Sequence, residues 1–133
     1  MDPGALKLIS GLADLMGVPA YYSEISRMLV ELNRSEASRS LFSVFTKDQP
    51  EEVRQEILND YYYPFRKMVF NHISRTVQHG EFILYIYAHS FAIEMKGAIR
   101  NADICLLHNP SRKSEKDIAA RMAASLHRDS QHL

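Results

Sequence analysis

The sequence is poor in several features that mark whole classes of protein. It has one cysteine, Cys105, so no internal disulfide can form and nothing points to an oxidising compartment. No apolar stretch approaches the roughly 20 residues that span a bilayer. The first residues show no basic segment followed by a long apolar run, so no signal peptide is expected. The predicted location is the cytoplasm.

The chain also has no excess of charge. Its 16 basic residues balance its 16 acidic residues, which gives a formal net charge of zero. Nucleic-acid binding calls for a basic surface, and attachment to a membrane surface calls for a basic cluster. We therefore expect neither a nucleic acid nor a membrane as partner.

Common catalytic motifs are missing as well. The sequence has no H-E-x-x-H, no P-loop, no G-x-G-x-x-G and no G-x-S-x-G. Its 133 residues, 46% hydrophobic and 24% charged, have the length and composition of one ordinary globular domain.

Helical patterns alternate with short apolar runs along this domain. Helices are predicted over residues 2–17, 50–58, 64–79 and 114–127. Strands are predicted over residues 28–32, 82–88 and 104–107. The segment 82–88 is the clearest strand, because it is apolar at every position and rich in aromatic and β-branched residues. The order of elements predicts an α/β fold, with a mainly parallel or mixed sheet flanked by helices.

Polar residues directly follow two of the predicted strands. Asn33 and Arg34 come after residues 28–32, and His89 and Ser90 come after residues 82–88. A right-handed crossover through helices makes two such strands parallel. Their carboxyl ends then lie on one edge of the sheet, where open α/β sheets bind ligands. We therefore expect these four residues to line one site.

Each candidate has a chemical role and a plainer alternative. The His89 imidazole suits metal binding or acid–base work, or it is a histidine satisfied by hydrogen bonds under a loop. The Arg34 guanidinium and the Asn33 amide suit a carboxylate, or they form a turn with a solvated arginine. Arg100 could line the same cleft or belong to a surface loop with an ion pair. A catalytic zinc needs about three protein ligands, and the spacing nominates His89 alone.

Six segments together resemble the N-formylglutamate amidohydrolase family across about residues 2–112. They are DPGA at 2–5, SRMLVELNRS at 26–35, LFSVFT at 41–46, YYYPFR at 61–66, AHSF at 88–91 and RNADICLL at 100–107. The resemblance implies a zinc-carboxypeptidase-like architecture and a zinc-dependent hydrolase that releases formate from N-formylglutamate. It implies that His89 is a zinc ligand, that Asn33 and Arg34 contact the substrate, and that Arg100 faces the site. No catalytic residue is assigned.

The sequence departs from the family pattern in places. Glu31 stands where an aspartate is usual, and Ala92 and Ile93 follow HSF where Thr-Pro is common. The family's upstream histidine motif and its downstream carboxylate have no match. We therefore expect residues 1–133 to form a single partial domain, with impaired or no activity and homo-oligomers through exposed sheet edges. The alternatives are a catalytically dead remnant that serves as a binding or scaffold domain, and an unrelated small α/β module.

Overall fold

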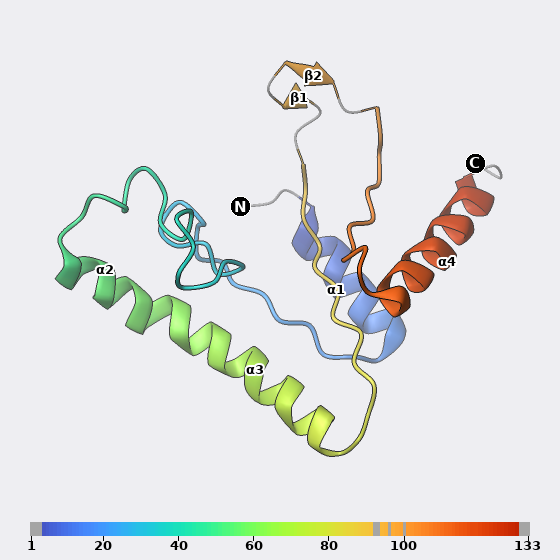
Figure 1. Ribbon diagram of the computed structural model, residues 1–133, viewed down its shortest axis with the longest axis horizontal. Helices are drawn as coiled ribbons and strands as arrows, with labels where there is room; N and C mark the ends of the chain where they lie inside the picture. Colours follow the sequence, from blue (N-terminus) through green and yellow to red (C-terminus); the bar gives the residue numbers. More distant parts are fainter. Residues whose placement is uncertain (1–3, 92–93, 96, 100, 131–133) are drawn as a thin grey trace. The chain divides into compact units, whose positions relative to one another are not determined.

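The chain forms two compact units, Met1–Phe91 and Ala92–Leu133. The computed structural model describes residues 4–91, 94–95, 97–99 and 101–130 (Figure 1). Among these residues, no helix is both long and apolar enough to cross a membrane.

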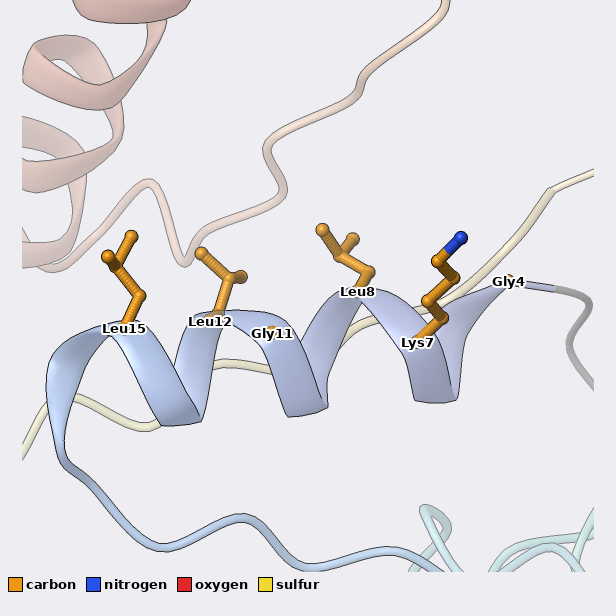
Figure 2. A pocket seen from close by; sticks show the side chains of 6 residues that line it. All are labelled: Gly4, Lys7, Leu8, Gly11, Leu12 and Leu15. Carbon is orange, nitrogen blue, oxygen red and sulfur yellow. The ribbon is translucent and has the colours of Figure 1, made fainter.

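The first unit begins with α1, Ala5–Met16, which confirms the predicted helix. The helix stops at Gly17, whose φ of 63° is left-handed and whose N–H bonds to the carbonyls of the last turn. Leu8, Leu12 and Leu15 recur at helical spacing and point the same way in Figure 2, and together with Gly11 they line a shallow depression. Leu15 is 83% exposed, so this apolar stripe faces solvent.

Two predicted helices are joined into one helical rod. α2, Glu51–Ile57, continues through the π-helical segment η1, Leu58–Tyr62, into α3, Tyr63–Gln78 (Figure 1). Pro64 lacks an N–H and its ring would clash with the carbonyl four residues earlier, that of Asp60. The wider π turn relieves this conflict and brings the Tyr63 N–H to the Leu58 carbonyl.

A long loop, residues 18–50, connects α1 to this rod. Side-chain hydroxyls hold the loop together: Ser43 Oγ donates to the Met28 carbonyl, and Thr46 Oγ1 donates to the Leu29 carbonyl at 2.8 Å. The Glu31 N–H donates to the Leu41 carbonyl, also at 2.8 Å. These bonds satisfy backbone groups that would otherwise pair in a sheet.

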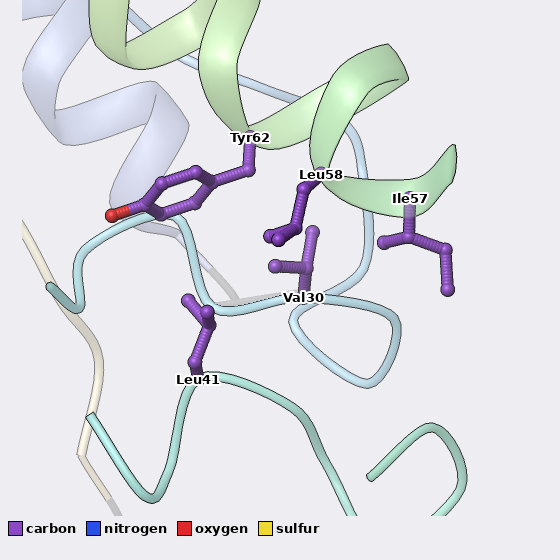
Figure 3. Close-up of a cluster of buried hydrophobic side chains, with 5 residues drawn as sticks. All are labelled: Val30, Leu41, Ile57, Leu58 and Tyr62. Atoms are coloured by element: carbon purple, nitrogen blue, oxygen red, sulfur yellow. The ribbon is translucent and has the colours of Figure 1, made fainter. Parts of the chain in front are cut away.

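The loop and the rod share the core of the first unit. Figure 3 shows the five buried side chains that form it, two from the loop and three from α2 and η1: Val30, Leu41, Ile57, Leu58 and Tyr62. Val30 is fully buried. The core therefore fixes the loop against the rod at the place where Val30 precedes Asn33 and Arg34.

The second unit contains a small hairpin and a helix. β1, Glu94–Met95, pairs antiparallel with β2, Ala98–Ile99, so that Glu94 lies opposite Ile99. Between them Gly97 has a φ of 78°, a left-handed value that favours glycine in a tight turn. α4, Lys113–Ser130, confirms the last predicted helix.

The predicted α/β fold is wrong. None of residues 28–32, 82–88 and 104–107 forms a strand, and β-structure in the described part of the chain is limited to the two-residue strands of the hairpin. A strand exists only when a second strand offers its backbone groups, and apolar composition does not supply that partner. In residues 28–32, the Leu29 carbonyl accepts a hydrogen bond from the Thr46 hydroxyl instead of from a strand. In residues 82–88, Phe82 is 78% exposed.

Candidate functional site

Asn33 and His89 meet in the first unit although they lie 56 positions apart in the chain. The distance from Asn33 Nδ2 to His89 Nε2 is 3.1 Å. Because the amide nitrogen donates, Nε2 accepts, and the proton of the neutral ring then lies on Nδ1. Both side chains are exposed, so a ligand can reach them.

Hydrogen bonds fix the turn that carries Asn33 and Arg34. The Arg34 N–H donates to the Glu31 carbonyl at 3.0 Å, and the Asn33 N–H donates to Glu31 Oε1 at 3.3 Å. The hydroxyl of Tyr62, whose ring is buried in the core, donates to the Arg34 carbonyl at 2.8 Å. The helical rod thus holds the turn in place through Tyr62.

The Arg34 guanidinium is exposed and makes no ion pair with any residue that the structure describes. The nearby carboxylate of Glu36 is engaged elsewhere, because it accepts a bond from Tyr63 Oη at 2.7 Å. This bond raises the pKa of the Tyr63 phenol above its usual range. Arg34 therefore offers a permanent positive charge with five N–H donors to an external anion.

A row of three rings leads away from the Asn33 contact. Tyr87 stacks on His89 with ring centroids 6.0 Å apart and planes 7° from parallel, and Tyr85 meets Tyr87 edge-on at 4.4 Å. Alternate residues of an extended chain lie on one side, which explains why residues 85, 87 and 89 form one row. The sequence carries this spacing of two, so the row could have been predicted from it.

The same two tyrosines line a groove against α3. Its volume is about 870 Å³, and α3 forms its other wall with the apolar side chains of Val69, Phe70 and Ile73 and the cationic Arg66 and Lys67. Burial raises the pKa of the Tyr85 phenol, and its hydrogen bond with Tyr87 raises that pKa further. Tyr87 belongs both to this groove and to the stack on His89.

The family model for N-formylglutamate amidohydrolase matches residues 1–133. The chain belongs to the N-formylglutamate amidohydrolase family. No curated protein and no solved structure matches it. The match covers both units of this amidohydrolase-family chain and confirms the predicted family.

The predicted site is partly brought together in this amidohydrolase-family chain. The structure brings Asn33 and His89 into contact, and Arg34 lies next to Asn33 in the same turn. Arg100 lies outside the described residues and stays a prediction. The sequence did not reveal the bond from Tyr62 to the Arg34 carbonyl, since no local pattern links residues 28 positions apart.

The described residues do not fit the zinc centre that the resemblance implies. A catalytic zinc takes about three protein ligands, usually histidine, cysteine or carboxylate. Among residues 4–91, 94–95, 97–99 and 101–130, no three such side chains gather. His89 Nε2 faces an amide rather than a second ligand. We therefore assign no reaction step to a metal.

Proposed function

We propose that this amidohydrolase-family chain binds N-acyl amino acids, and that Asn33, Arg34 and His89 form the binding site. The contact of Asn33 Nδ2 with His89 Nε2 at 3.1 Å carries the proposal. It brings the Asn33 amide, which stands beside Arg34, together with an imidazole 56 positions away. Family membership supports a small-molecule amide as the substrate.

Each side chain supplies a different interaction. The Arg34 guanidinium pairs with the substrate carboxylate through two parallel N–H bonds. Asn33 keeps a second N–H and its carbonyl oxygen for the amide group of the ligand. His89 orients Asn33 by accepting its first N–H, and Tyr87 fixes the imidazole plane by stacking.

Calorimetric titration with N-formyl-L-glutamate tests this site. We expect saturable binding that Asn33→Ala weakens about twofold to tenfold, the loss of one hydrogen bond. Asn71→Ala is the matched control, because Asn71 is an exposed asparagine of α3 outside the site. Equal affinity of the two variants would remove Asn33 from the site.

Hydrolysis by this chain is proposed to be impaired. One imidazole and one amide can hold and orient a ligand, but the imidazole is a single general base, and among the described residues no three metal-binding side chains gather to activate water through a zinc. Formate release from N-formyl-L-glutamate should stay at the uncatalysed rate, with or without added zinc. Turnover that Arg34→Ala abolishes would show an active enzyme instead. This outcome separates the amidohydrolase function from the alternative, a catalytically dead binding domain.

The other predictions on partners rest on exposure and composition. Homo-oligomers stay a prediction, supported now by the open leucine stripe of α1 rather than by sheet edges, and sizing chromatography would detect them. A cytoplasmic location and the absence of nucleic-acid and membrane partners stay predictions from the single cysteine and the balanced charge.

A further inference from the structure

The groove beside α3 and the proposed binding site meet at Tyr87. This residue lines the groove and also stacks on His89, whose Nε2 accepts from Asn33. A ligand held by its carboxylate and amide at Arg34 and Asn33 therefore has the groove as the neighbouring surface. This inference rests on the proposed function and concerns the acyl end of the same ligand.

We propose that the groove receives the acyl group, and that the chain prefers N-acyl amino acids whose acyl group is large and apolar. A formyl group has no apolar surface to bury, whereas the open groove has a volume of about 870 Å³. The size of the groove thus matches an acyl group much larger than formyl.

The chemistry of the walls matches the same ligand. Val69, Phe70 and Ile73 come from one side of α3, and Phe70 is 68% exposed. The rings of Tyr85 and Tyr87 meet edge-on with centroids 4.4 Å apart, and both line the groove, where their ring surfaces suit apolar contact. An apolar acyl group would cover side chains that water now covers, and this burial favours binding.

The row of rings also gives the direction of the acyl group. Tyr85, Tyr87 and His89 follow one another at every second position. The row runs from the His89 ring to the Tyr87 ring, 6.0 Å between centroids, and on to the Tyr85 ring, a further 4.4 Å. An acyl group of several carbons or an aromatic ring can lie along this row, while its amide stays near Asn33.

Calorimetric affinities for N-formyl-, N-octanoyl- and N-benzoyl-L-glutamate test the proposal. We expect the octanoyl and benzoyl ligands to bind at least about tenfold more tightly than the formyl ligand, because they bury apolar area. Phe70→Ala should bring the ratio of the octanoyl or benzoyl affinity to the formyl affinity close to one. Val77→Ala, another exposed apolar residue of α3 that does not line the groove, should preserve the ratio.

The outcomes separate this proposal from the proposed function. Equal affinity of the wild-type chain for all three ligands, or a ratio that survives Phe70→Ala, would overturn the acyl groove. Arg34→Ala should instead weaken all three ligands by the same factor. Arg34→Ala could change no affinity while Phe70→Ala still abolishes the preference for large acyl groups. That result would contradict the proposed carboxylate site and support the acyl groove.

Discussion

Replacing Tyr62 with alanine should lower the free energy of unfolding of the first unit by about 3–5 kcal/mol, the usual cost of deleting a buried aromatic side chain. The Tyr62 ring packs with Val30, Leu41 and Leu58, and its hydroxyl donates to the Arg34 carbonyl. Domains have only about 5–15 kcal/mol of net stability. Urea unfolding followed by circular dichroism should therefore show a transition at much lower urea.

Two further variants divide the effect of Tyr62 into its parts. Tyr62→Phe keeps the ring and removes the hydroxyl, so it should cost about 1 kcal/mol and loosen the turn of Asn33 and Arg34. Tyr61→Ala is the matched control, because the neighbouring Tyr61 is exposed and outside the core. If Tyr61→Ala destabilises the unit as much as Tyr62→Ala does, the core does not rest on Tyr62.

Replacing Arg34 with alanine should weaken binding of N-formyl-L-glutamate roughly tenfold to 150-fold. Hydrogen bonds to a charged group contribute about 1.5–3 kcal/mol, and Arg34 is the cation proposed to pair with the substrate carboxylate. Calorimetry measures this loss directly. Arg34→Lys should recover part of the affinity, because lysine keeps the charge but lacks the planar fork.

Arg39→Ala is the control for Arg34. Arg39 lies in the same loop, is exposed and carries the same charge, so its removal changes the overall electrostatics equally. A similar loss of affinity in both variants would mean that diffuse charge, rather than a paired guanidinium, attracts the ligand.

The helices could be predicted from the sequence because their signals are local. Gly17 ends α1 as expected, and the apolar spacing of residues 64–79 gives α3 nearly to the residue. The π-helical segment was missed, although Pro64 following three tyrosines is a local sign of conflict in a helix. Helix ends follow from residues a few positions apart, and this is why pattern reasoning succeeds there.

The sheet could not be predicted, because its formation depends on distant partners. Residues 82–88 have a strand-like composition, but no strand pairs with them in the described chain. Residues 28–32 instead give their carbonyls to Ser43 and Thr46, hydroxyls that lie up to 17 positions away. The expected closeness of Asn33 and His89 is nevertheless found, through the packed loop rather than through a sheet edge.

Nuclear magnetic resonance of the Asn33 side-chain amide and the His89 ring nitrogens tests the central claim most directly. Before ligand is added, His89 should show the neutral tautomer with its proton on Nδ1, as acceptance at Nε2 requires. N-formyl-L-glutamate should shift the Asn33 amide and the His89 ring signals along one saturation curve, and leave those of His72 and His79 unmoved. Saturable binding that moves neither Asn33 nor His89 would contradict the site.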